Sequence, residues 1–255
     1  MDIYPLTAFV FSGLIGLSLG LIGGGGSIIT LPVLVYLAGI DPPSAVGMSL
    51  AIVGATSLVG AVFHYLRGTV DLKKGALFGG FGLGGAYFGS GLTRLVSGET
   101  LLLIFALLMM AVALAMMLRK GPPRIERASG PTDLKKTAAA GLAVGVLTGF
   151  LGVGGGFLIV PALVLFGGVE IGAAIGTSLV VIAINSAAGL FGQIQFHPLD
   201  LKMTAAYTVI ACLGTWMGAR LGEGASPERL QKGFAWFAMA VALFLIFKNQ
   251  GTIIR

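Results

Sequence analysis

The sequence predicts an all-α membrane protein that crosses the bilayer several times and is built from two homologous repeats. Three observations support this fold class: 56% of the 255 residues are hydrophobic, only 10% are charged, and the chain matches itself at a fixed offset of 129 residues. Because a soluble domain carries roughly 25% charged residues, we expect the surrounding solvent to be lipid. The first residues contain no basic segment and no evident cleavage site, so the first apolar run is expected to be a retained span.

The internal match runs without a gap from about residue 13 to residue 119. GGGGSIITLP at 23–32 aligns with GVGGGFLIVP at 152–161, and AVGMSL at 45–50 aligns with AIGTSL at 174–179. Similar helix composition alone would not place Pro, Asp and Glu in register, so we expect repeat 1 at 1–118 and repeat 2 at 137–255, within a single membrane domain. Residues 119–136 contain six Lys or Arg together with Pro and Gly, which favours a basic cytoplasmic linker.

Each repeat contains three apolar stretches of about 20 residues, long enough to cross a hydrocarbon core of about 30 Å. They are 45–66, 72–94 and 99–118 in repeat 1, and 174–195, 201–221 and 229–247 in repeat 2. A longer apolar region precedes them, at 6–40 and 137–169, and contains the glycine cluster. Its length of about 34 residues corresponds to about 51 Å of helix. We therefore expect a helical hairpin broken at the glycines, and about four to five helical segments in each repeat.

The relative orientation of the repeats depends on whether the broken region turns back or crosses once. A hairpin gives each repeat an odd number of crossings and makes the repeats inverted, whereas a single crossing makes them parallel. The positions of Lys and Arg fit both arrangements equally well. The length of the broken region favours inverted repeats, which are common in secondary transporters.

The two glycine clusters predict a binding site for a small oxyanion. Irregular backbone at membrane depth occurs where protein covers it or water reaches it, and a helix that restarts after a break offers free N–H groups and a partial positive charge. Glycine lets an anion approach that backbone closely, and Thr30 could add a hydroxyl donor beside the cluster. The alternative is that the glycines only form a tight hairpin tip or let two helices pack. The candidate binding residues in the clusters are Gly24, Gly25, Gly26, Ser27, Gly154, Gly155 and Gly156.

Small polar residues recur at aligned positions in the stretches 45–66 and 174–195, and their spacing of seven residues places them on one helical face. They could line a central path, which we favour for Asn185. The alternative is hydrogen bonding between helices or back to the helix's own carbonyl groups, which we favour for the single serines, including Ser57 and Ser186. The candidate binding residues in these stretches are Ser49, Thr56, Thr177, Ser178 and Asn185.

His64 lies late in its predicted span and aligns with Gln193. It is a candidate for proton coupling, or else a capping or interfacial residue beside Arg67. No Asp or Glu falls in the middle of a predicted span, which argues against a cation site and suits an anionic solute. No Cys/His cluster predicts a metal site, and no cofactor is expected.

Four GxxxG pairs predict close contacts between helices. A G-x-G-x-x-G match at 80–85 follows no predicted strand, so it does not indicate a dinucleotide site. The GxxxG pairs are Gly16/Gly20, Gly85/Gly89, Gly145/Gly149 and Gly214/Gly218.

The sequence resembles the sulfite exporter TauE/SafE family at GGGGSIITLP, at GVGGGFLIVP and at the paired GMSL and GTSL. The resemblance covers nearly the whole chain. It implies a multi-pass permease of the cell inner membrane that handles sulfite, sulfonates or other sulfur-containing or organic anions, often as an exporter. Met48 stands where repeat 2 has Thr177, so the two repeats are expected to contribute unequally to a site.

We therefore expect a secondary transporter of small anions that works by alternating access at a site between the repeats. The alternative is an anion channel with the same donors along a continuous pore. An enzyme is not expected, because Phe88 replaces the glycine that a rhomboid-like G-x-S-G motif around Ser90 requires. The expected partners are a small anionic solute and the lipid bilayer, and not nucleic acid despite the net charge of +6. The substrate, the direction of transport, the coupling ion and homo-oligomer formation stay open.

Overall fold

The computed structural model describes residues 3–118, 134–152, 156–165, 169, 171–195, 199–222 and 227–248. Over these residues the chain is helical apart from short connections, and no strand occurs among them. Gly154, Gly155 and most of the predicted linker lie outside the described residues, and α6 begins at Leu134, inside the predicted linker range. The helices are α1 Ile3–Ile22, α2 Gly25–Tyr36, α3 Pro42–Leu66, α4 Leu72–Leu92, the 3-10 helix η1 Thr93–Leu95, α5 Gly98–Leu118, α6 Leu134–Leu151, α7 Gly156–Leu165, α8 Ile171–Gln193, α9 Leu201–Leu221 and α10 Pro227–Lys248.

Three of the described helical stretches are long and apolar enough to cross a membrane by length and composition alone: Pro42–Leu66, Gly98–Ala115 and Gly172–Gln193. Shorter apolar helical stretches occur within α1, α2, α6 and α10. The glycine-rich α4 and the helix α9 have 21 residues each, about 31 Å of helix. This composition is that of an all-α membrane protein.

Both glycine clusters interrupt the helices, as predicted. In the first half of the chain, α1 ends at Ile22 and α2 begins at Gly25, with Gly23 between them at a φ of 72°. In the second half, α6 ends at Leu151 and is followed by Gly152 at a φ of 67°. Side chains other than glycine rarely adopt this left-handed conformation, which explains why glycine follows each helix.

Aspartate side chains begin three of the helices. Asp41 accepts a hydrogen bond from the N–H of Ser44, and Asp71 and Asp200 make the same type of bond at the starts of α4 and α9. Because Asp41 caps α3 and Pro42 occupies its first turn, where no N–H partner is needed, α3 starts three residues earlier than the predicted span.

The GxxxG pairs bring two pairs of helices into backbone contact, which confirms the predicted close packing. A Cβ added at Gly16 would collide with the carbonyl oxygen of Ala211, so α1 lies directly against α9. A Cβ at Gly85 would collide in the same way with the carbonyl oxygen of Leu142, which places α4 directly against α6. The fourth α-helix of each half therefore packs with the other half: α9 lies on α1 and α3, and α4 lies on α6 and α8.

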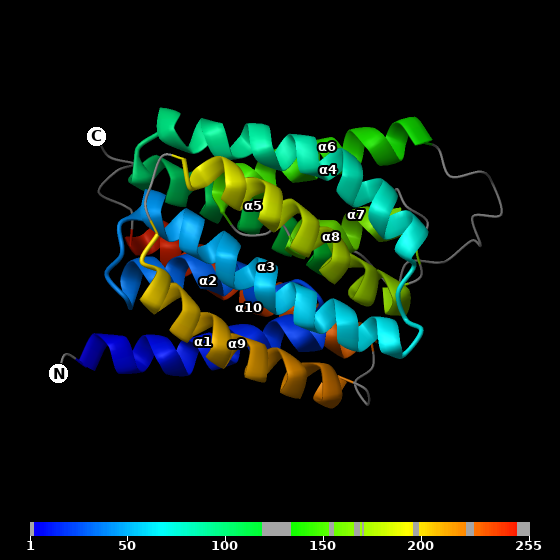
Figure 1. Cartoon of the computed structure of the whole chain (residues 1–255), viewed down its shortest axis with the longest axis horizontal. Helices are drawn as coiled ribbons and strands as arrows, with labels where there is room; N and C mark the ends of the chain where they lie inside the picture. The colour runs from blue at the N-terminus through cyan, green and yellow to red at the C-terminus, as the bar shows by residue number, and fades with distance from the viewer. Residues whose placement is uncertain are drawn as a thin grey trace.

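The helices form two groups of opposite direction. In Figure 1, α1, α3 and α9 run from left to right, whereas α4, α6 and α8 run from right to left. The groups meet where α3 crosses α8, and there Gly54 lies against Ser186 while Gly60 lies against Leu179, so that the two helices are antiparallel. Helices α5 and α10 pack on each other.

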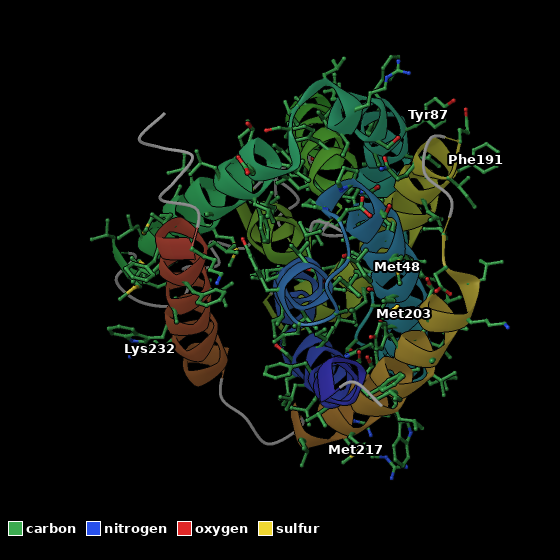
Figure 2. All side chains as sticks on the ribbon, turned by 90° about the vertical axis from the view of Figure 1, so that its left-hand side faces the viewer. Met48, Tyr87, Phe191, Met203, Met217 and Lys232 are labelled. Carbon is green, nitrogen blue, oxygen red and sulfur yellow. The ribbon has the colours of Figure 1, made fainter. Side chains whose placement is uncertain are left out.

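Large apolar side chains occupy both the interior and the outer surface of the bundle. Met48 lies inside the bundle on α3, whereas Tyr87 and Phe191 project outward from α4 and α8 (Figure 2). One buried apolar cluster joins α2, α3, α5 and α10, and a second joins α7 and α8 to their neighbours. Large apolar side chains on the outer surface are expected where the solvent is lipid.

Candidate functional site

The two helix interruptions lie against each other. Gly156, the first residue of α7, faces Gly24, which precedes the first residue of α2. A Cβ added at Gly156 would lie 2.7 Å from the Gly24 Cα and 3.1 Å from the Gly24 carbonyl oxygen. The start of α2 and the start of α7 are therefore neighbours inside the bundle, as a site shared by both halves requires.

Each interruption also rests on a helix of the opposite half. A Cβ at Gly23 would lie 2.8 Å from the carbonyl oxygen of Ile175 on α8, and a Cβ at Gly152 would lie 2.7 Å from the Cα of Val46 on α3. Gly23 aligns with Gly152 and Val46 aligns with Ile175 at the offset of 129 residues. The two contacts are thus the same contact made once by each half.

The hydroxyl groups beside the first break are used within α2. Ser27 Oγ donates to the carbonyl oxygen of Gly24 at 2.7 Å, and Thr30 Oγ1 donates to the carbonyl oxygen of Gly26 at 3.0 Å. In this conformation their hydrogens are not offered to a ligand. Gly24 is the N-cap residue of α2, and no side chain at this position accepts a hydrogen bond from the first N–H groups of the helix. These N–H groups have no partner within the helix itself. Backbone N–H groups are therefore the donors that the break can supply.

Three of the five candidate side chains on α3 and α8 are hydrogen-bonded. Ser178 donates to the carbonyl oxygens of Gly23 and Ile175, at 2.8 Å and 2.7 Å. Thr177 Oγ1 accepts from the N–H of Asp71 at 2.9 Å, which places this side chain at the start of α4. Thr56 Oγ1 donates back to its own helix at Ile52, at 2.7 Å. These three side chains have structural partners.

The other two candidates, Ser49 and Asn185, are fully buried and have no hydrogen-bond partner. Ser57 and Ser186 are also buried without a hydrogen-bond partner. The hydrogen bonds to another helix or to their own helix that we expected for these two serines are therefore not formed. Buried polar groups are almost always paired in native proteins. An unpaired group at a buried position is therefore a candidate for pairing with a bound water, with a ligand or in a second conformation.

Asn185 lies close to the meeting point of the two breaks. Its side-chain amide packs against Gly82 of α4, in space that a Cβ at residue 82 would need. Ile182, three residues earlier on α8, contacts Gly156, and three residues correspond to about 4.5 Å along a helix. The glycine breaks and the unpaired amide are thus neighbours along α8.

His64 lies near the C-terminal end of α3, against the start of α8. Its Nδ1 is 3.0 Å from Thr69 Oγ1, and the Thr69 hydroxyl also lies 3.0 Å from the carbonyl oxygen of His64. Its Nε2 is buried without a partner. A Cβ added at Gly176 of α8 would lie 2.9 Å from the His64 Cβ, and the preceding residue, Ile175, lies against Gly23. The structure therefore places His64 near the first break, on the far side of Ile175 from Gly23.

Only neutral polar groups are buried among the described residues. No Asp, Glu, Lys or Arg belongs to the buried set of this part of the chain, and it contains no group of three His, Cys, Asp or Glu that could hold a metal ion. Within the described ranges the interior thus offers amide, hydroxyl and backbone groups.

Sequence reasoning missed one further buried polar group. Tyr207 is fully buried on α9 and its hydroxyl has no partner. It aligns with Phe78 at the offset of 129 residues, so no repeated polar pattern pointed to it. The equivalence of Ser57 and Ser186, by contrast, was visible in the sequence.

The family of this protein is identified by comparison with known proteins. A family model described as Sulfite exporter TauE/SafE matches residues 8–245. The chain belongs to the TauE/SafE sulfite exporter family. A probable membrane transporter protein of Xylella fastidiosa strain 9a5c is 33% identical over the full length of both chains. The probable membrane transporter protein YdhB of Bacillus subtilis is 29% identical, covering 92% of this chain and 97% of the relative.

A probable membrane transporter protein of Haemophilus influenzae is also 29% identical, and the match covers 97% of this chain and 100% of the relative. No solved structure matches the chain. Membership of the TauE/SafE family and the relatives' names indicate a membrane transporter and not an enzyme.

Proposed function

We propose that the protein is a secondary transporter of small anions and that the substrate binds between the two halves, where α2 and α7 begin. The observation that carries this proposal is the contact of Gly24 with Gly156. Ile182 of α8 also lies against Gly156, and the fully buried and unpaired Asn185 follows Ile182 by three residues. Sulfite, organosulfonates and related sulfur-containing or organic anions are the proposed substrates, in keeping with the family description.

The chemistry of the site favours an oxyanion. Free N–H groups and the positive end of the helix dipole at the starts of α2 and α7 attract negative charge, and glycine allows close approach. The absence of buried carboxylates among the described residues removes the usual ligands of a coupled cation. An anion bound there would be held by neutral donors in a medium of low dielectric, where each hydrogen bond is strong.

We further propose that the halves are inverted repeats. In alternating access, each half would then adopt the conformation that the other half had before. Support comes from the antiparallel crossing of α3 and α8 and from the opposite directions of α1 and α6 (Figure 1). The matched contacts of Gly23 with Ile175 and of Gly152 with Val46 also fit this relationship. Inverted repeats supply two mirrored conformations around one central site. The full burial of Ser49 and Asn185 fits an occluded state.

Transport assays in proteoliposomes test the function. Sulfite, sulfate, sulfonates and carboxylates are offered with and without a pH gradient. Saturable uptake with counterflow of at least one anion is the expected result, and the absence of specific uptake for every anion would overturn the proposal. Large unitary currents without counterflow would instead identify an anion channel.

Reporter fusions test the orientation and the proposed location in the cell inner membrane. A reporter after Arg255 is expected to report a periplasmic C-terminus, and a reporter inserted after Lys120 is expected to report the cytoplasm. A cytoplasmic signal from both fusions would contradict inverted repeats, because it requires an even number of crossings between the two positions.

A further inference from the structure

Helices α3 and α8 carry three buried polar side chains without partners. Ser57, Asn185 and Ser186 are fully buried, and none of their side-chain polar atoms has a hydrogen-bond partner. The Ser186 Cβ lies 3.1 Å from the position of a Cβ at Gly54, one turn before Ser57. Ser186 therefore faces α3, whereas the side-chain amide of Asn185 packs against Gly82 of α4, so that both residues lie at contacts of α8 with the first half.

Asn185 differs from the serines because it presents a separate donor and a separate acceptor. A hydroxyl can rotate and serve as either, but in an amide Nδ2 only donates and Oδ1 only accepts. Both atoms of Asn185 are unpaired. A ligand that pairs both atoms must therefore offer an acceptor oxygen and a hydrogen-bond donor at the same time.

The charge of a suitable ligand is limited by its surroundings. No basic side chain is buried among the described residues, so only partial charges of amides, hydroxyls and helix starts oppose the ligand's charge. The energy of transferring an ion out of water rises steeply with its charge when no counter-ion accompanies it. A single negative charge suits this site better than two.

We propose that Asn185 makes the transporter selective for singly charged oxyanions that also carry a hydrogen-bond donor. The Nδ2 group donates to an oxygen of the anion, and Oδ1 accepts from the hydroxyl or N–H of the same substrate. This inference rests on the proposed function. Thr56, which aligns with Asn185, bonds to its own helix at Ile52, so the recognition resides in the second half alone.

Two sulfonates of equal charge and similar size test the proposal. Hydroxymethanesulfonate and ethanesulfonate differ by a hydroxyl in place of a methyl group. In proteoliposomes, wild-type protein is expected to show a kcat/KM about tenfold higher for hydroxymethanesulfonate, because ethanesulfonate leaves a buried acceptor unpaired. Sulfate, a fixed dianion, is expected to give no specific uptake.

Two variants locate the preference at Asn185. Asn185→Leu has similar size and no polar atoms, and Asn185→Thr copies the aligned residue of the first half. Both are expected to bring the ratio of the two sulfonates close to one. Thr208→Val removes a hydroxyl that bonds back to Thr204 on α9 and is expected to keep the wild-type ratio.

Equal kcat/KM values for the two sulfonates with wild-type protein would overturn the inference without any variant. It would also be overturned if Asn185→Leu kept the wild-type preference or if sulfate entered as fast as the sulfonates. Transport of both sulfonates without discrimination leaves the proposed function intact, whereas no specific uptake of any anion contradicts the proposed function itself.

Discussion

Ser178 donates its hydroxyl hydrogen to the carbonyl oxygen of Gly23 at 2.8 Å, which ties α8 to the break that precedes α2. Ser49 is the aligned residue in the first half, one turn from the Val46 that contacts Gly152. The Ser49 hydroxyl has no partner. The two halves therefore differ in this bond, and we expect them to exchange it when the protein changes conformation.

Alanine substitutions at the two serines are expected to shift the conformational equilibrium in opposite directions. Ser178→Ala removes a bond that stabilises the observed conformation by about 1 kcal/mol, which is about a fivefold change in population. Ser49→Ala removes the corresponding bond of the opposite conformation. Alkylation of cysteines introduced on each membrane face of a Cys212→Ala background measures the shift. A shift in the same direction for both variants would contradict the exchange.

Gly156→Ala is expected to lower the initial transport rate at least about tenfold, because its Cβ would lie 2.7 Å from Gly24 and from Ile182. Gly80→Ala is the matched control, since a Cβ at this position of α4 has no neighbour within 4 Å. Uptake into proteoliposomes at equal protein amounts is the measurement. Wild-type uptake by Gly156→Ala would argue against a substrate site at the meeting of the breaks.

Adjacent glycines of α4 are expected to respond differently to the same substitution. Gly85→Ala is expected to destabilise the protein by about 1–3 kcal/mol, because its Cβ collides with the backbone of Leu142. Gly84→Ala has open space around its Cβ and is expected to leave stability unchanged or to raise it by up to about 1 kcal/mol. Thermal unfolding in detergent measures both. Equal melting temperatures would mean that α4 and α6 are not in backbone contact.

His64→Gln tests whether proton coupling is confined to one half, because glutamine is the aligned residue at position 193. Gln193 donates to the carbonyl oxygen of Pro43 at 3.1 Å and is buried, so the substitution is compatible with this type of environment. We expect the variant to transport at wild-type rates without a pH gradient and to lose any stimulation by an imposed gradient. Stimulation equal to that of the wild type would remove His64 from the coupling mechanism.

The sequence predicted the helix interruptions because their cause is local. Gly23 and Gly152 have the left-handed conformation that glycine adopts readily. The predicted span 45–66 began three residues after the start of α3, because Asp41 and Pro42 begin this helix outside the apolar stretch.

The helix partners were not predictable in the same way. The glycines of α4 indicate that a backbone will approach, but nothing in their spacing says that the backbone belongs to α6. Ser49 and Ser178 illustrate the same limit for side chains, because they occupy aligned positions and yet only Ser178 is hydrogen-bonded. Such differences arise from the conformation of the whole molecule.

The packing of α1 on α9 and of α4 on α6 has a consequence for how the protein is made. The ribosome completes α4 at Leu92 before it begins α6 at Leu134, and it completes α1 at Ile22 long before it reaches α9 at Leu201. The glycine-lined surfaces of α1 and α4 must therefore enter the membrane without their final neighbours. Assembly finishes only near the end of translation, and fragments that stop after the first five helices are expected to be targets of membrane proteases.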